Sequence, residues 1–191
     1  PVRSPRGRPR PDAGRQVDLV AANNVLAHVP DINDFVQGFA ILLKDNGVAT
    51  FEFPHLLRLL RENQFDTVYH EHYSYLSLGA VERVFAACGL AVFDVEELPT
   101  HGGSLRVFAQ RSEGGRRARS DAVDRVLGDE RAAGLATAEG YTGFQARIDK
   151  LKDEFVAYLI EARRAGRTVA AYGAAAKGNT LMNYAGVRPD H

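Results

Sequence analysis

Apolar positions follow two different periods along the chain, and this pattern predicts strands separated by helices. The nearly continuous apolar run 17–22 predicts a short buried strand. Apolar residues at helical spacing then predict a helix that Asp31 caps and that Asn46-Gly47 ends in the left-handed conformation. The apolar face of this helix consists of Ile32, Phe35, Val36, Phe39, Leu42 and Leu43.

The same alternation continues through the middle of the chain. A second strand is predicted at 48–53, where Pro54 ends it, and a short helix at 55–63 leads into a loop. Beyond that loop, 79–88 has helical spacing and is stopped by Gly89.

Two further strands, 90–98 and 104–111, flank the turn 101–103, whose two glycines predict an antiparallel hairpin. The order of elements therefore predicts an α/β fold in which a parallel sheet ends in an antiparallel edge. In such sheets ligands bind beyond the carboxyl ends of the strands. Positions 23–24 and 54–55 both fall at such ends.

The second half of the chain has a different character. A charged, glycine-containing linker is predicted at 112–120, followed by helices up to residue 165. A strand at 168–172 and a helix beginning near Asn179 are then expected. The strongest helix, 144–164, has an apolar stripe that favours core packing over a partner helix. This stripe consists of Ile148, Leu151, Phe155, Tyr158, Leu159 and Ala162.

Composition narrows the classes of function. Of 191 residues, 45% are apolar and the formal net charge is zero, which indicates a globular chain and argues against nucleic acid as its main partner. Cys88 cannot form an internal disulfide, and its apolar neighbours predict a buried thiol in a reducing compartment. No apolar run approaches the roughly 20 residues that span a bilayer, and no signal peptide is recognisable, so we expect a cytoplasmic protein without a membrane partner.

The N-terminal segment 1–16 is rich in arginine and proline and has almost nothing to bury, so we expect it to be disordered. A basic arm for nucleic acid is the alternative, which the lack of interleaved aromatic residues disfavours. The chain begins with Pro1, and its only methionine is Met182. We therefore expect a fragment of a longer protein.

The loop after the second strand concentrates acid-base chemistry. Tyr69, His70, Glu71 and His72 place a phenol, a carboxylate and two imidazoles in four consecutive residues, which favours proton transfer. A polar loop with solvated or backbone-bonded histidines is the simpler alternative. A metal site at 70–72 is disfavoured because adjacent residues rarely direct all their donors at one ion.

A second candidate site lies near the C-terminus. The small residues 173–176 followed by Lys177 join the predicted strand to a helix start, where backbone N–H groups and a lysine can hold an anion. The glycine spacing of a P-loop is absent. A tight strand-to-helix turn without a ligand fits the same residues.

Four motifs in this order together resemble one protein family. They are NNVLAHVPD at 23–31, YHEH at 69–72, HGGSLR at 101–106 and YGAAAKGNT at 172–180. They resemble the S-adenosylmethionine-dependent C-methyltransferases of nucleotide-linked deoxysugars. The resemblance implies methylation of a ring carbon of a 4-keto sugar that is attached to a nucleoside diphosphate.

The resemblance also implies a domain order: an N-terminal zinc-binding domain, a class I methyltransferase domain and a C-terminal Rossmann-like domain. On this basis 17–112 is the C-terminal half of the methyltransferase domain, 113–165 a linker with helices, and 166–191 the start of the nucleotide-binding domain. Zinc is expected only in the domain that this sequence lacks.

The implied chemistry starts with removal of a proton from the carbon beside the ketone, which needs a base and a group that stabilises the enolate oxygen. By resemblance His72 is the general base, Glu71 orients its imidazole, and Tyr69 positions the sugar or stabilises the enolate. His70 occupies a variable position of the motif and inherits no role.

The other motifs receive binding roles by the same resemblance. Asn23, Asn24 and His28 are expected near S-adenosylmethionine, although His28 is equally consistent with a backbone-bonded histidine at a helix entry. The remaining positions are expected to contact the nucleotide-linked sugar, although 101–103 also fits a simple tight turn. They are His101, Gly102, Gly103, Lys177, Asn179, Thr180 and Asn183.

The sequence departs from the family pattern at its start. It lacks a glycine-rich loop after a first strand, an acidic residue for the ribose hydroxyls and the four-cysteine zinc cluster. We therefore expect the isolated chain to be poorly stable and inactive. Two rival functions remain: a non-catalytic module that binds nucleotide sugars, and methylation of O or N on another small molecule.

Overall fold

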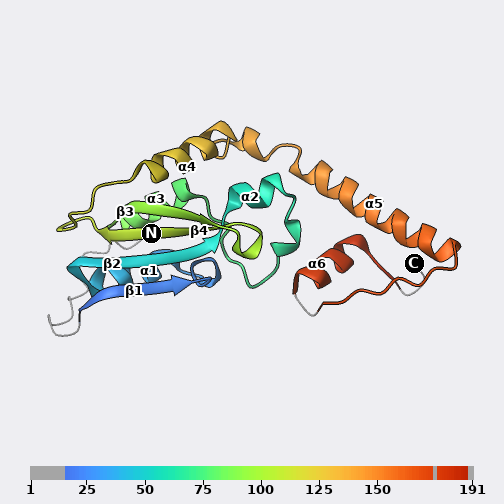
Figure 1. Ribbon diagram of the computed structural model, residues 1–191, viewed down its shortest axis with the longest axis horizontal. Coiled ribbons are helices and arrows are strands. Elements are labelled where there is room, and N and C mark those ends of the chain that lie inside the picture. The colour runs from blue at the N-terminus through green and yellow to red at the C-terminus, as the bar shows by residue number, and fades with distance from the viewer. Residues whose placement is uncertain (1–15, 174–175, 189–191) are drawn as a thin grey trace.

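The computed structural model describes residues 16–173 and 176–188, and its centre is a sheet with strand order β1-β2-β4-β3 (Figure 1). β1 runs parallel to β2, whereas β4 pairs antiparallel with both β2 and β3. The predicted parallel strands with an antiparallel hairpin are therefore confirmed. The predicted burial of residues 17–22 is wrong, because β1 is an edge strand of the described sheet on which Val17 and Leu19 are exposed. The strands are β1 (Val17–Asn23), β2 (Leu43–Pro54), β3 (Leu90–Leu98) and β4 (Ser104–Arg111).

The helices lie where the periodicity predicted them, with two exceptions described below. Asp31 caps the first one as expected, because its carboxylate accepts a hydrogen bond from Asp34 N. The helices are α1 (Ile32–Leu42), α2 (Leu56–Arg61), α3 (Leu78–Ala87), α4 (Asp121–Ala132), α5 (Phe144–Arg164) and α6 (Ala176–Ala185). Short 3-10 turns are η2 (Leu26–His28), η3 (Phe65–Thr67), η4 (Thr100–Gly102) and η5 (Ala138–Tyr141).

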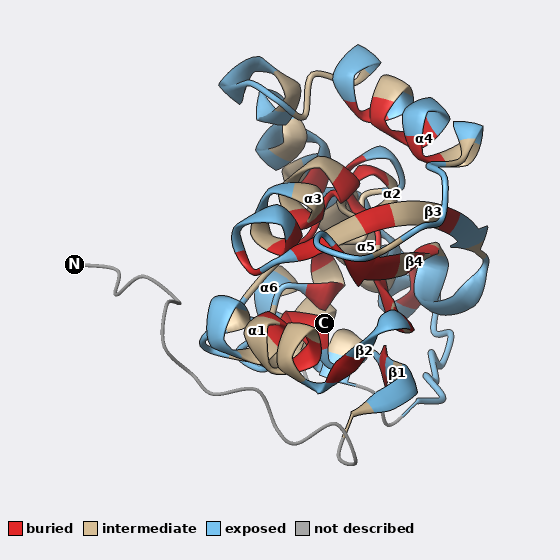
Figure 2. Ribbon diagram, turned by 90° about the vertical axis from the view of Figure 1, so that its left-hand side faces the viewer, coloured by how far each residue is buried: buried red, intermediate tan, exposed pale blue. Residues whose placement is uncertain are grey.

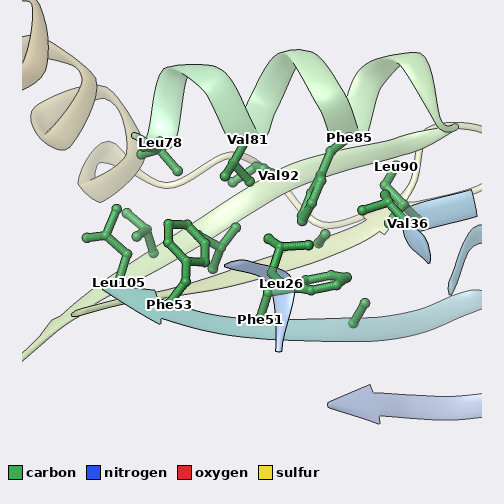
Figure 3. Packing of buried hydrophobic residues seen from close by; sticks show 14 of the residues in the cluster. Leu26, Val36, Phe51, Phe53, Leu78, Val81, Phe85, Leu90, Val92 and Leu105 are labelled. Carbon is green, nitrogen blue, oxygen red and sulfur yellow. The ribbon is translucent and has the colours of Figure 1, made fainter. Parts of the chain in front are cut away.

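The core lies between the sheet and the helices packed on one of its faces, and Figure 2 shows buried residues concentrated there. The ring of Phe51 on β2 lies 4.6 Å, centroid to centroid, from the rings of Phe39 on α1 and Phe85 on α3. Figure 3 shows Phe85 and Val81 directed toward the strands. Burial of each such side chain contributes about 1.5–3 kcal/mol to the stability of the fold. These contacts therefore hold α1 and α3 against this face of the sheet.

The predicted end of the first helix is wrong. α1 ends at Leu42, and Asn46 and Gly47 belong to β2. The pairing of β1 with β2 shifts register there, from Val17 opposite Leu43 to Leu19 opposite Val48, so the intervening residues of β2 form a bulge. A Cβ on Gly47 would lie 2.8 Å from Leu43 Cδ2, so the glycine allows close packing and does not end a helix.

The prediction of a core stripe on α5 is also wrong in part. Of this stripe, Ile148 and Ala162 are buried, whereas Tyr158 is exposed.

The predictions for the chain after α5 are wrong in part as well. Residues 168–172 form no strand, and α6 begins at Ala176, three residues before Asn179. Within the described ranges Val169 and Tyr172 are exposed and 168–172 has no neighbouring strand. A strand needs such a partner for its backbone hydrogen bonds. The predicted disordered segment lies outside the described residues, apart from Gln16.

No helix in the described part of the chain is long and apolar enough to cross a membrane.

Candidate active site

The carboxyl end of β1 meets the β3–β4 hairpin. Asn24 has a left-handed backbone (φ 54°), and its N–H donates to Glu52 O at the end of β2. Its side-chain Nδ2 lies 3.3 Å from Nε2 of His101. Asn23 is exposed at the same end of the sheet. The structure therefore brings two of the predicted motifs together at the carboxyl end of β1.

The Tyr69 loop, residues 68–76, is attached to the residues that follow β1. The backbone N–H groups of Tyr73 and Ser74 both donate to Ala27 O, at 2.9 and 3.3 Å. Nδ1 of His28 lies 3.0 Å from the backbone oxygen of Glu71. A carbonyl can only accept, so Nδ1 of His28 is the donor. His28 thus makes the backbone contact that the sequence allowed, and this contact joins two of the four motifs.

His72 is held in one tautomer by the 3-10 turn that precedes the loop. Its Nδ1 lies 2.8 Å from the backbone oxygen of Thr67 in η3. Since that oxygen only accepts, Nδ1 carries the proton, and the neutral ring keeps its lone pair on Nε2. The ring packs between His28 and Tyr69, with centroid distances of 4.6 Å to each.

His72 also lines a small cavity of about 20 Å³ together with Thr67, Tyr75 and Pro54. That volume corresponds to about one water molecule. Tyr75 meets the imidazole edge-on at 5.9 Å. The half-buried imidazole is therefore enclosed by aromatic rings and fixed by a single backbone oxygen.

Two phenols beside His72 stay protonated at neutral pH. Burial raises the pKa of Tyr69, and the charges of Glu71 and Asp66 raise it further. Burial also raises the pKa of Tyr75. A neutral phenol can donate a hydrogen bond to a developing oxyanion.

Glu71 and His70 are both exposed. The backbone of Glu71 contacts His28, and the oxygen bonded to Nδ1 of His72 comes from Thr67. In the described ranges no three His, Cys, Asp or Glu side chains are grouped as metal ligands.

The hairpin needs its two glycines. Gly103 has φ 109°, and a Cβ there would lie 2.7 Å from Arg58 Cγ on α2. A Cβ on Gly102 would meet the side chain of Gln64. The two glycines and Arg58 line a cavity of about 500 Å³ between α2 and the hairpin, together with His55.

The sequence analysis missed a buried carboxylate near the carboxyl end of β2. Glu52 is 5% exposed, and its oxygens accept from Arg106 at 2.8 Å and Thr100 at 3.0 Å. The hydrogen bond from Arg106 lowers the pKa of Glu52 against the opposing effect of burial. Its signal was a lone acidic residue between Phe51 and Phe53 in an otherwise apolar strand.

A second buried pair was also missed. Nε2 of His55, directly after β2, lies 2.8 Å from Oε1 of Glu130 on α4. The carboxylate of Glu130 also accepts the backbone N–H groups of Leu78 and Gly79 at the start of α3. No sequence pattern marked Glu130, because the contact spans 75 positions.

The predicted nucleotide-binding residues lie on α6. Lys177 and Thr180 are half-buried, whereas Asn179 and Asn183 are exposed. α6 lies beside the loop that follows α2 (Figure 1), where the ring of Tyr184 lies 5.1 Å from that of Phe65. Residues 174–175 of the predicted anion loop lie outside the described part of the chain.

Known proteins resemble both halves of the chain. Residues 6–95 match a methyltransferase domain family, and residues 99–191 match the C-methyltransferase C-terminal domain. The C-methyltransferase NovU of Streptomyces niveus is 38% identical over 169 residues, which cover 88% of this chain and 40% of NovU. The chain is therefore similar to C-methyltransferases in both of its halves. It spans less than half the length of this curated relative.

Solved methyltransferase structures resemble about half of the chain more distantly. An S-adenosylmethionine-dependent methyltransferase from Mesorhizobium loti matches with TM-score 0.42 and 16% identity, covering 51% of this chain and 62% of that one. Magnesium protoporphyrin IX methyltransferase from Synechocystis, solved with S-adenosylhomocysteine, matches with TM-score 0.40 and 17% identity. The match covers 52% of this chain and 47% of that one.

Proposed function

We propose that the full-length protein containing this chain is an S-adenosylmethionine-dependent C-methyltransferase, and that it methylates the carbon beside the ketone of a nucleotide-linked 4-keto sugar in deoxysugar biosynthesis. His72 is the general base. The similarity to NovU supports C-methylation, and the described site supplies the acid-base groups that this reaction needs.

The observation that carries the proposal is the hydrogen bond from Nδ1 of His72 to Thr67 O. It leaves the Nε2 lone pair of the neutral ring free to accept a proton from carbon, and it stabilises the imidazolium that forms. The C–H electron pair then becomes an enolate. A positioned base of this kind contributes typically about 10²–10⁴-fold to the rate.

The enolate oxygen needs a donor that stays protonated. Tyr69 is half-buried against the His72 ring, and its raised pKa keeps the phenol neutral. We assign it the hydrogen bond to the developing oxyanion, which lowers the barrier to proton removal. Glu71 was expected to orient the His72 imidazole, but the partner of His72 Nδ1 is Thr67 O. We therefore assign Glu71 a different role, in which its backbone contact with His28 orients the loop.

Three residues fit the cofactor by their position. Asn23 and Asn24 offer amide donors and acceptors at the carboxyl end of β1, and His28 lies against the His72 ring. When bound, S-adenosylmethionine supplies the methyl group that the enolate carbon receives. The side-chain amides of Asn23 and Asn24 would hold and orient it.

The sugar nucleotide is assigned to the hairpin and to α6. We assign contacts with the sugar to His101, Gly102 and Gly103, and the two glycines line the cavity of about 500 Å³. Lys177 in the first turn of α6 suits a diphosphate, because its charge adds to the partial positive charge of the helix N-terminus. We assign polar contacts with the nucleotide to Asn179, Thr180 and Asn183.

Substitution of the base tests the proposal. In the full-length protein His72→Asn removes the basic nitrogen, so methyl transfer should fall by about 10²–10⁴-fold while calorimetry still detects binding of the sugar nucleotide. His70→Asn is the matched control, because His70 is the exposed histidine of the same loop, and it should retain normal turnover. If His72→Asn keeps full activity, His72 is not the base. If the wild type binds a sugar nucleotide but transfers no methyl group, the protein is a binding module.

A further inference from the structure

The loop that holds His72 is contacted by two segments that are distant in sequence. The residues after β1 hold its C-terminal part through Ala27 and His28. The segment directly before the loop, which includes η3 and Thr67, lies against α5 and α6. Contacts to η3 matter for His72 because Thr67 O fixes the imidazole tautomer.

Arg147 on α5 holds the entry to η3. Its guanidinium donates to Leu60 O at 2.8 Å, in the last turn of α2, and to Oδ1 of Asn63 at 3.0 Å. Asn63 has a left-handed backbone (φ 54°), a conformation that asparagine tolerates better than most residues. The arginine therefore satisfies an end carbonyl of α2 and fixes the turn into η3.

Tyr184 on α6 holds the middle of η3. Its ring packs on that of Phe65, with centroids 5.1 Å apart at an interplanar angle of 56°. Its hydroxyl donates a hydrogen bond to Oδ1 of Asp149 on α5 at 2.5 Å, and this bond also orients the ring. Phe65 is only 9% exposed. We call the contacts that Arg147 on α5 and Tyr184 on α6 make with residues 60–65 the clamp.

The clamp also connects to the proposed substrate site. Lys177, Thr180 and Tyr184 are spaced three, four and seven positions apart on α6, which places them on one face of the helix. A ligand held by Lys177 therefore contacts the same helix that orders η3.

We propose that Arg147 and Tyr184 are positioning residues for His72: they hold η3 so that Thr67 O stays bonded to Nδ1, and they link the proposed nucleotide site on α6 to the base. This inference rests on the proposed function for its catalytic consequence. Its structural part concerns only the order of η3.

The test measures solvent deuterium exchange at the carbon beside the ketone. The probe is a nucleoside diphosphate-linked 4-keto-deoxyhexose, incubated with the full-length protein in D₂O without methyl donor. Tyr184→Ala and Arg147→Gln should lower the exchange turnover about tenfold or more, with KM for the probe changed much less, because the base is misplaced and not removed. Tyr184→Phe keeps the ring on Phe65 and loses only the hydroxyl, with its contact to Asp149, so its turnover should fall less than that of Tyr184→Ala.

Matched controls separate positioning from general destabilisation. Tyr158→Ala and Arg163→Gln remove exposed side chains of the same types from α5, and both should exchange deuterium at the wild-type rate. If Tyr184→Ala and Arg147→Gln keep wild-type turnover, or if the controls lose as much, the clamp does not position His72.

Amide hydrogen exchange tests the clamp independently of activity. The N–H of Val68 donates to Phe65 O, and the N–H of His72 donates to Tyr69 O. Both amides should exchange faster in Tyr184→Ala and keep wild-type protection in Tyr158→Ala. Unchanged protection in Tyr184→Ala overturns the clamp. If the wild type exchanges no deuterium into the probe, the proposed function fails, and amide protection alone decides the clamp.

Discussion

Glu130 and His55 form a buried pair that joins α4 to the end of β2, with 2.8 Å between Oε1 and Nε2. Glu130 is 4% exposed and His55 is 2% exposed. The same carboxylate accepts the first N–H groups of α3, as an N-terminal cap would. One side chain of the second half of the chain thus fixes the positions of a strand end and a helix start.

Removal of this carboxylate should destabilise the protein strongly. Glu130→Ala leaves His55 Nε2 and two backbone N–H groups without their acceptor, which typically costs about 3–5 kcal/mol for a broken buried pair. The free energy of unfolding measured by urea titration checks this value. Asp129→Asn is the control on the same helix, since Asp129 is exposed, and it should change stability little. A loss below about 1 kcal/mol for Glu130→Ala contradicts the assignment.

Acid should remove the same stabilisation. Burial opposes ionisation of Glu130, but the hydrogen bonds from His55, Gly79 and Leu78 outweigh it and lower its pKa below the ordinary 4.5. A lowered pKa means that the folded state binds the proton more weakly than the unfolded chain does. The stabilisation by ionised Glu130 is therefore fully present above pH 4.5. It is lost as the pH falls through the lowered pKa of Glu130. The stability gap between wild type and Glu130→Gln should narrow in acid, and a constant gap contradicts the shift.

Two glycines should respond in opposite directions to the same substitution. Gly47→Ala places a Cβ 2.8 Å from Leu43 Cδ2 and 3.0 Å from Val17 O, so it should destabilise the β1–β2 bulge by about 1–3 kcal/mol. Gly38→Ala, inside α1 with nothing within 4 Å of the new Cβ, should stabilise by about 0.5–1 kcal/mol. Thermal unfolding of both variants checks the pair. Equal effects contradict the bulge geometry.

Local sequence signals predicted most of the fold. The bounds of β3, β4 and α5 follow from alternation, glycines and helical spacing, because each element is set by its own side chains. The end of α1 could not be predicted, because Asn46-Gly47 resembles a helix stop and only the pairing of Leu43 with Val17 reveals the bulge. The strand expected at 168–172 failed because its formation depends on a neighbouring strand.

The candidate site was predictable where its groups are adjacent in sequence. His72 and Tyr69 stand in one motif, so their proximity followed from the chain itself. The groups that hold them did not follow: Thr67 acts through a backbone oxygen that any residue would provide. Glu52 and Arg106 meet across 54 positions, through the β2–β4 pairing.

In the proposed reaction His72 removes a proton from the carbon beside a ketone, and proton exchange without methyl donor isolates that step. With the nucleotide-linked 4-keto sugar in D₂O, the full-length wild type should place deuterium on that carbon. His72→Asn should lower the rate by about 10²–10⁴-fold, while His70→Asn exchanges normally. Equal exchange by the wild type and His72→Asn would contradict the account.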